Sequence, residues 1–220
     1  MVKIYFIRHG KTEWNLESRY QGAGGDSPLL KTSYSEMDQL AKALKHIKFE
    51  HVFASPIKRA RITAQHVRSQ LDFIPEISLW NRLEEFHLGK MEGQKFMDVK
   101  AQFPEQFTNF REHPEKYDNH EIGGENFQEV IDRMTPAVKL IARDYPNPDQ
   151  NVMVVSHGAA LNALINSLLN EPLADLRKRG GLSNTSTTIL ETVDQGQTFK
   201  LIKWNDTDYL NRPLDSTDTI

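Results

Sequence analysis

The stretches Phe6-Ile7-Arg8-His9-Gly10 and Val154-Val155-Ser156-His157-Gly158 have the same form. In each, an apolar run typical of a strand is followed by a polar residue, a histidine and a glycine, and then by a predicted helix. Ligands of open α/β sheets bind outside the carboxyl ends of the strands, so we expect both histidines at that edge of one sheet. The glycines allow close approach of a ligand to the backbone, and the helix N-termini beyond them suit an anion.

Strand and helix patterns alternate along the rest of the chain. Strands are predicted at residues 2–7, 52–55, 77–79 and 151–155, helices at about 35–48, 57–71, 127–142 and 159–169, and a hairpin of strands at 187–193 and 198–204. This order predicts an α/β fold, a three-layer α/β/α sandwich with a mostly parallel sheet. We expect a single domain over residues 1–204, with a small helical cap inserted at about 94–121. The acidic stretch 205–220 is predicted to be a loosely ordered tail.

Composition excludes several classes of protein. The chain has 220 residues, 38% hydrophobic and 26% charged, as in ordinary soluble globular proteins. A net charge of −3 argues against a nucleic-acid partner, and no apolar run is long enough to cross a bilayer. The first residues are too short an apolar stretch for a signal peptide, so we expect a cytoplasmic protein without a membrane partner. The absence of cysteine excludes disulfides and thiolate metal sites, and the sequence leaves open whether the chain forms a homodimer.

Two further segments carry candidate functional side chains. Arg59 stands in the first turn of a predicted helix, where a cation opposes the helix dipole; bidentate binding of a phosphate is a reason for its presence. The adjacent carboxylates Glu84 and Glu85 follow a short predicted strand and precede Gly89 and Gly93. That setting suits a general acid at the rim of a pocket, and spacing alone does not choose between the two glutamates.

Taken in order, Arg8-His9-Gly10, Arg59, Glu85 and His157-Gly158 resemble the histidine phosphatase superfamily, which has the phosphoglycerate-mutase-like fold. Further matching pieces are Thr12, Asn15, Arg19, Gln21-Gly22, Asp26-Ser-Pro-Leu29, Ser55-Pro-x-x-Arg-Ala-x-x-Thr-Ala64, Gly123-Gly-Glu125, Asn184 and Ser186. The resemblance covers about residues 2–193. The chain departs from the family pattern at 31–39 and at Met91, where the family usually has tryptophan, and neither place carries a reactive group.

The resemblance implies that His9 is the nucleophile and forms a phosphohistidine. Imidazole attacks only when it is neutral, and nearby cations lower its pKa. Arg8, Arg59 and a protonated His157 are expected to do so while they hold the phosphoryl oxygens. Asn15 is expected to donate a hydrogen bond to the same group.

By the same resemblance, Glu85 protonates the leaving oxygen and then takes a proton from the attacking water. The residues expected to bind substrate are Asn15, Gln21, Gly22 and Gly158. The histidines show no spacing typical of metal ligands, so we expect neither a metal nor another cofactor.

The predicted function is that of a histidine acid phosphatase, hydrolysing small-molecule phosphomonoesters. The alternatives are a phosphoglycerate mutase, a fructose-bisphosphatase-like sugar phosphatase, and a catalytically inactive scaffold on the same fold. The cap at 94–121 resembles the shorter insert of the phosphatases and lacks the arginine pair and proline run of the glycolytic mutases. A scaffold would be expected to have lost part of the pocket, whereas every charged member is present.

Overall fold

The computed structural model describes residues 1–219 and contains one six-stranded sheet. Its strands are β1 (Val2–Arg8), β2 (His51–Ala54), β3 (Glu76–Leu79), β4 (Gln150–Ser156), β5 (Thr187–Thr192) and β6 (Lys200–Asp206). They lie in the order β3-β2-β4-β1-β5-β6. The first four of these are parallel, β5 is antiparallel to β1, and β6 is antiparallel to β5. The mostly parallel sheet and its terminal hairpin are therefore confirmed.

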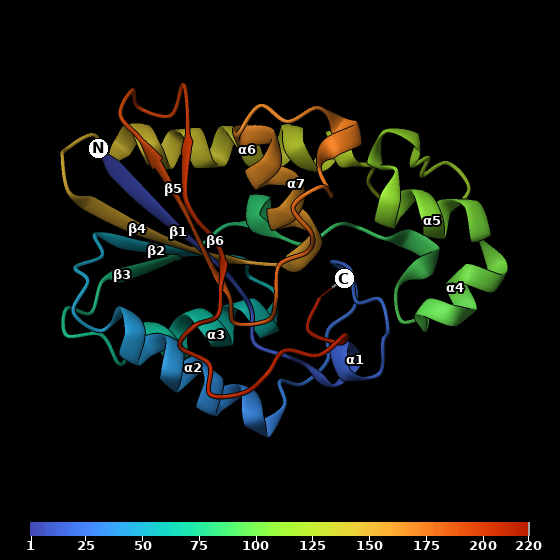
Figure 1. Cartoon of the computed structure of the whole chain (residues 1–220), viewed down its shortest axis with the longest axis horizontal. Coiled ribbons are helices and arrows are strands. Elements are labelled where there is room, and N and C mark those ends of the chain that lie inside the picture. The colour runs from blue at the N-terminus through green and yellow to red at the C-terminus, as the bar shows by residue number, and fades with distance from the viewer. Residues whose placement is uncertain (220) are drawn as a thin grey trace.

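Helices cover both faces of this sheet (Figure 1). The α-helices are α1 (Glu13–Leu16), α2 (Lys31–Leu44), α3 (Lys58–Arg68), α4 (Phe96–Gln102), α5 (Pro104–Glu112), α6 (Phe127–Asp144) and α7 (Gly158–Leu168). Successive side chains of a strand point to opposite faces. Accordingly, Ile4 and Phe6 of β1 belong to the core beneath α6 and α7, and Tyr5 and Ile7 to the core beneath α2 and α3. The three-layer sandwich is confirmed.

The boundaries of α2 differ from the prediction. We expected this helix from about Ser35 to Lys48, but it begins at Lys31 and ends at Leu44. Ser35 lies inside it, and its carbonyl accepts a hydrogen bond from the Gln39 side chain. The Ser33 hydroxyl near the start of α2 donates to the Lys11 carbonyl at 2.6 Å. The helix start is thus supported by a contact with a distant loop, which local spacing does not reveal.

The segment at about 94–121 contains α4 and α5, which form a small lobe beyond the carboxyl ends of the parallel strands (Figure 1). Phe110 of α5 packs against Phe86, Tyr117 and Phe127, with ring centroids 5.4, 5.1 and 5.4 Å away. The lobe therefore shares an aromatic core with the rest of the domain. None of the helices within residues 1–219 combines the length and apolarity that crossing a membrane requires.

The expectation of a loosely ordered tail is wrong for residues 205–219, while residue 220 lies outside the described residues. β6 extends to Asp206, past the predicted end of the domain at 204. The Tyr209 hydroxyl then donates to the Thr185 carbonyl at 2.6 Å, and the Arg212 side chain pairs with Glu36 at 2.6 Å. Asp218 is fully buried. The tail is held by these contacts and by the pairing of Asp215 and Asp218 with Lys11.

Candidate active site

The register of the sheet brings the two histidines together. Arg8, at the end of β1, pairs with Ser156, at the end of β4, so the next residue on each strand emerges at the same edge. The ring centroids of His9 and His157 are 5.2 Å apart. His157 Nε2 lies 2.8 Å from the Ser55 hydroxyl, which follows the neighbouring strand β2. The expectation that both histidines meet at one sheet edge is confirmed.

His9 is buried and held as a neutral ring. Its Nδ1 lies 2.7 Å from the Gly10 carbonyl, and because a carbonyl only accepts, Nδ1 carries the proton. Nε2 therefore has the lone pair and accepts a hydrogen bond from Arg59 Nε at 3.3 Å. Burial, and then the charges of Arg59 and Arg8, lower the pKa of His9 well below its usual value. This imidazole has the tautomer and charge of a nucleophile.

Arg8 is buried, and only one of its three guanidinium nitrogens has a hydrogen-bond partner in the described residues. Its Nη1 donates to the carbonyls of Leu182 at 2.5 Å and Asp218 at 2.6 Å. Its Nε and Nη2 are buried without a hydrogen-bond partner among residues 1–219. Burial lowers the pKa of the guanidinium to about 10, so it remains charged at neutral pH. A Cβ on Gly158 would lie 2.8 Å from Arg8 Nε, so a glycine at this position leaves room for the arginine side chain. Gly158, which we expected to bind substrate, is not among the residues that line the reaction cleft described below.

Arg59 is fixed by a loop of the N-terminal segment. Its Nη1 donates to the Gly25 carbonyl at 2.8 Å and to Asp26 at 3.2 Å, and its Nη2 donates to the Gly22 carbonyl at 2.8 Å. These bonds orient the Arg59 side chain so that its Nε donates to His9 Nε2. They explain why an arginine stands in the first turn of α3, where the helix dipole opposes it.

The charge of the His157 ring differs from the prediction. We expected its ring to be protonated. Instead, burial and then the charge of Arg59 lower its pKa well below the usual value, so the ring is neutral at pH 7. Its Nδ1 is buried and has no hydrogen-bond partner in the described part of the chain. The cations that lower the pKa of His9 are Arg59 and Arg8.

Glu85, not Glu84, is the buried carboxylate of the site. Its Oε2 accepts from the Ala159 amide at 3.2 Å, and its Oε1 accepts from the amides of Ala160 at 2.8 Å and Phe86 at 3.0 Å. The amides of Ala159 and Ala160 belong to the first turn of α7, where the helix dipole favours a negative charge. Glu84 contacts His87 instead, at 3.9 Å.

Sequence reasoning missed Arg133, which holds the loop that carries Glu85. This side chain extends from α6 and donates to the carbonyls of Glu84 and Glu85, each at 3.2 Å. It is held in turn by two hydrogen bonds to Glu125, at 2.7 and 2.9 Å. The available signal was Glu125, which belongs to the family motif Gly123-Gly-Glu125.

His9, Arg59 and Glu85 line one cleft, whereas Arg8 and His157 are not among its lining residues. Its lining consists of His9, Asn15, Tyr20, Gln21, Gly22, Arg59, Glu85, Leu88, Phe110 and Ala159. Asn15 Oδ1 accepts from the backbone and hydroxyl of Thr12, so the Asn15 NH₂ group remains as the donor toward the cleft. Gln21 donates to the Thr12 hydroxyl at 2.8 Å and accepts from Ser27 at 3.1 Å. Gln21 therefore braces the wall of the cleft.

No group of three or more His, Cys, Asp or Glu side chains within residues 1–219 is arranged to hold a metal ion. The expectation that the protein works without a metal stays a prediction. It is tested with the proposed function below.

The docked tail forms part of the support of Arg8. The Asp218 carbonyl accepts from Arg8 Nη1 and from the Asn184 amide. The Asp218 carboxylate accepts two hydrogen bonds from Arg212, at 2.6 and 2.7 Å, and lies 3.1 Å from Lys11 Nζ. The side chain thus anchors the carbonyl that orients Arg8.

We therefore expect Asp218→Ala to lower kcat/KM for any phosphomonoester about 10- to 100-fold, because small displacements of an aligning group are costly. The affinity for vanadate, which binds as a mimic of the phosphoryl group, should fall as well. Arg212→Ala should lower both quantities in the same direction, and by more than Arg212→Lys. Asp208→Ala, at an exposed acid of the same tail, is the control. Full activity and vanadate affinity in Asp218→Ala would show that the tail does not position Arg8.

Comparison with known proteins finds relatives over most of the chain. The model of the histidine phosphatase superfamily (branch 1) matches residues 4–207. Phosphoglycerate mutase-like protein 4 of Arabidopsis thaliana is 30% identical, over 95% of this chain and 87% of that protein. A probable phosphoglycerate mutase of Escherichia coli, GpmB, is 31% identical over 78% of this chain and 77% of its own length.

Two solved structures share the fold over nearly their whole length. YhfR of Bacillus stearothermophilus is 31% identical with a TM-score of 0.86, covering 95% of this chain and 99% of that one. Mycobacterial glucosyl-3-phosphoglycerate phosphatase, solved as a complex with VO3, is 28% identical with a TM-score of 0.82, covering 93% and 99%. With the family model matched from residue 4 to residue 207, this chain belongs to the histidine phosphatase superfamily.

Proposed function

We propose that this protein hydrolyses small phosphomonoesters through a phosphohistidine intermediate on His9. The observation that carries the proposal is the state of the His9 ring: it is neutral, protonated at Nδ1, and presents Nε2 beside Arg59. Arg8 adds two N–H groups without partners in residues 1–219. A phosphoryl group between these arginines would have its charge neutralised while Nε2 attacks in line.

Two steps complete the reaction. In the first, the bond from His9 Nε2 to phosphorus forms as the ester P–O bond breaks, and Glu85 delivers a proton to the leaving oxygen. In the second, water attacks phosphorus, the P–N bond breaks, and Glu85 takes back a proton. Two observations support this role for Glu85: it shares the cleft with His9, and three backbone amides hold its carboxylate.

A phosphoglycerate mutase is the second candidate, favoured by the names of the two curated relatives. It would use the same first step and pass the phosphoryl group to a substrate hydroxyl. The solved relative with VO3 is a phosphatase by name, which favours transfer to water. The cap is consistent with a phosphatase because it lacks the arginine pair of the glycolytic mutases.

A panel of phosphorylated metabolites and p-nitrophenyl phosphate tests the proposal. We expect release of inorganic phosphate without 2,3-bisphosphoglycerate, undiminished by excess EDTA and inhibited by vanadate. Interconversion of 2- and 3-phosphoglycerate that depends on 2,3-bisphosphoglycerate and exceeds phosphate release would favour the mutase. Loss of activity on chelation that returns with added metal would contradict the metal-independent mechanism.

A further inference from the structure

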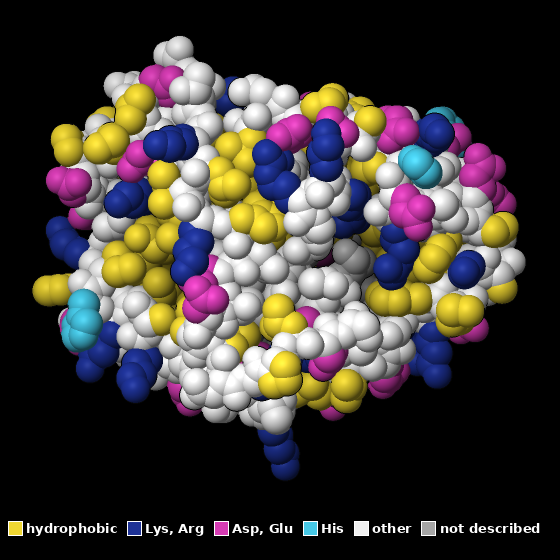
Figure 2. All heavy atoms as spheres, viewed as in Figure 1, with side chains coloured by type: hydrophobic (Ala, Val, Ile, Leu, Met, Phe, Trp, Pro, Cys, Tyr) yellow, Lys and Arg dark blue, Asp and Glu magenta, His cyan; other side chains and the backbone are white. Residues whose placement is uncertain are grey.

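Charged side chains of both signs are intermixed over the visible face of the molecule (Figure 2). The net charge of the whole chain is −3. Overall charge therefore does not attract small anions to this protein, and a second site for an anion has to be built from local groups.

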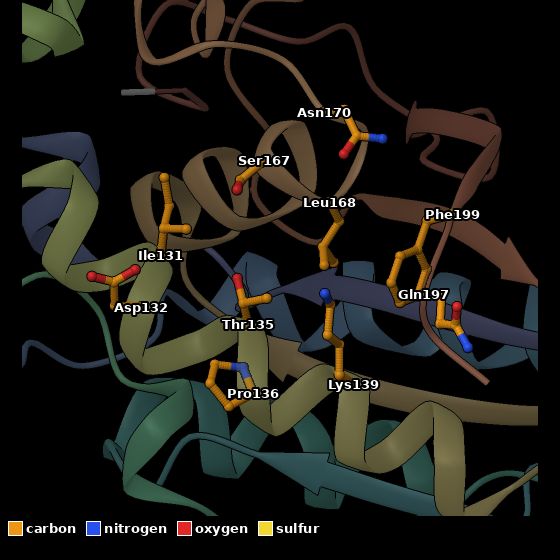
Figure 3. Close-up of a pocket in the computed structure, with 10 residues that line it drawn as sticks. All are labelled: Ile131, Asp132, Thr135, Pro136, Lys139, Ser167, Leu168, Asn170, Gln197 and Phe199. Atoms are coloured by element: carbon orange, nitrogen blue, oxygen red, sulfur yellow. The ribbon is translucent and has the colours of Figure 1, made fainter. Parts of the chain in front are cut away.

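A hollow of about 590 Å³ lies between α6, the end of α7 and the hairpin of β5 and β6 (Figures 1 and 3). None of its lining residues lines the reaction cleft. A Cβ on Gly196 would lie 2.9 Å from the Ala142 Cβ, so the turn of the hairpin packs directly on α6. The size of the hollow is typical of sites that bind small molecules.

The turn of α6 that borders the hollow has hydrogen-bonding groups that the helix does not use. Pro136 lies inside this helix and has no N–H, so the carbonyl of Asp132 lacks its usual helical donor. The Thr135 hydroxyl oxygen is buried and has no hydrogen-bond partner within residues 1–219, although hydroxyls inside helices commonly bond to a carbonyl of the preceding turn. Both residues line the hollow, so a ligand there can satisfy these groups.

Lys139 is the cation of this hollow. The other cations of α6, Arg133 and Arg143, face carboxylates at 2.7 and 3.9 Å, whereas Lys139 forms no ion pair within residues 1–219. The Asp132 carboxylate accepts from the Gln128 side chain at 2.8 Å. In Figure 3 the Lys139 ammonium and the Thr135 hydroxyl extend into the same space, and the Asp132 carboxylate points away from Lys139.

These charges suit a ligand with one negative charge. Lys139 is the single Lys or Arg among the described residues that line the hollow. Ser167 and Leu168 lie at the end of α7, where the helix dipole disfavours further negative charge. A carboxylate carries one charge, whereas a phosphate monoester carries nearly two at neutral pH. A carboxylate is therefore the better match.

The two helices beside the hollow are the helices that hold Glu85. Arg133 of α6, one turn before Pro136, donates to the Glu85 carbonyl at 3.2 Å. The amides of Ala159 and Ala160, in the first turn of α7, hold the Glu85 carboxylate. A ligand that contacts α6 on both sides of Pro136 and the end of α7 would fix the position of one helix relative to the other. Its binding would then reach Glu85 through these two packed elements.

We propose that this hollow binds a small hydroxylated carboxylate as an effector, and that its binding raises turnover by fixing Glu85. The carboxylate pairs with Lys139, and hydroxyl groups of the ligand bond to Thr135 and to the carbonyl of Asp132. Its carbon chain packs on Leu168 and Phe199. The effect on turnover rests on the proposed function, whereas binding to the hollow does not.

Binding is tested by calorimetry with D-gluconate and two probes that each lack one of its features. Sorbitol has the hydroxyl groups without a carboxylate, and hexanoate has a carboxylate without hydroxyl groups. With the reaction cleft saturated by inorganic phosphate, we expect gluconate to bind with a Kd of about 1 mM, and both other probes at least severalfold more weakly. Equal binding of the three probes, or displacement of gluconate by inorganic phosphate, would reject the site.

Variants locate the bound gluconate. Lys139→Gln should weaken its binding by about 10-fold or more, the effect of a lost charge-assisted hydrogen bond. Thr135→Val, which keeps the shape of the side chain, should weaken it severalfold. Lys42→Gln, at an exposed lysine of α2, is the matched control and should bind as the wild type does. Unchanged binding in both Lys139→Gln and Thr135→Val would place gluconate outside the hollow, and an equal loss in Lys42→Gln would assign the effect to overall charge.

The coupling to Glu85 is tested with two esters. Saturating gluconate should raise kcat for an alkyl phosphate about fivefold, and for p-nitrophenyl phosphate by less, because p-nitrophenolate departs without a proton from Glu85. Sorbitol at the same concentration should have no effect, and the response should be lost in Lys139→Gln but kept in Lys42→Gln. Equal effects on both esters, or no effect when calorimetry shows full occupancy, would overturn the coupling. If no phosphomonoester is hydrolysed at all, the proposed function fails, while calorimetry still decides whether the hollow binds gluconate.

Discussion

His9→Ala is expected to lower kcat for phosphomonoester hydrolysis by roughly 10⁴- to 10⁶-fold, the loss that follows removal of a covalent nucleophile. His9 is the ring whose Nε2 carries the lone pair beside Arg59, whereas His157 Nε2 lies 2.8 Å from the Ser55 hydroxyl. Steady-state kinetics measure the loss, and circular dichroism checks the fold. His46→Ala, at an exposed histidine of the surface, is the control and should retain activity.

The same prediction can be followed by chemical labelling. Brief incubation of the wild type with a ³²P-labelled phosphomonoester and an alkaline quench should leave label that is stable in base and lost in acid, as expected of a phosphohistidine. Peptide mapping should place this label on His9. Stable label on another residue would mean that the nucleophile is wrongly assigned. Full turnover by a folded His9→Ala protein would exclude His9 altogether.

Glu85→Gln is expected to lower turnover of alkyl phosphates about 10²- to 10⁴-fold, because the leaving alkoxide then departs without a proton. p-Nitrophenolate needs no protonation, so the loss with p-nitrophenyl phosphate should be much smaller. Some loss remains because Glu85 also activates water in the second step. The glutamine oxygen can still accept from Ala160 and Phe86, although the bond from Ala159 is lost, and Arg133 continues to hold the backbone of the loop.

Glu84→Gln is the matched control, one residue away. Its side chain contacts His87 and does not line the cleft, so turnover of either ester should change only a few-fold. Equal losses in Glu85→Gln on both esters, without a burst of p-nitrophenol, would refute the role of Glu85 as the acid. A large loss in Glu84→Gln alone would assign that role to Glu84.

Sequence reasoning located the strand-end residues because their signal is local. An apolar run that ends in Arg8-His9-Gly10 predicts a buried strand and a polar edge, and β1 and β4 pair so that His9 and His157 meet there. The position of Arg59 was predicted by the same logic, as a cation that its own helix disfavours. Spacing alone did not choose between Glu84 and Glu85 as the acid, and the family resemblance selected Glu85. Only the tertiary contacts of its carboxylate with the amides of Ala159 and Ala160 show why Glu85 is the one that lies in the site.

The sequence by itself determined the three-layer fold and the reactive edge of the sheet, since apolar periodicity and strand-end residues are properties of short segments. Only the tertiary structure decided the rest. Asp218 binds Arg212 and Lys11 and turns an acidic tail into support for Arg8. Burial beside Arg59 makes His157 neutral, contrary to the expected charge. Desolvation and pairing between distant segments set these properties, and neither is a function of local sequence.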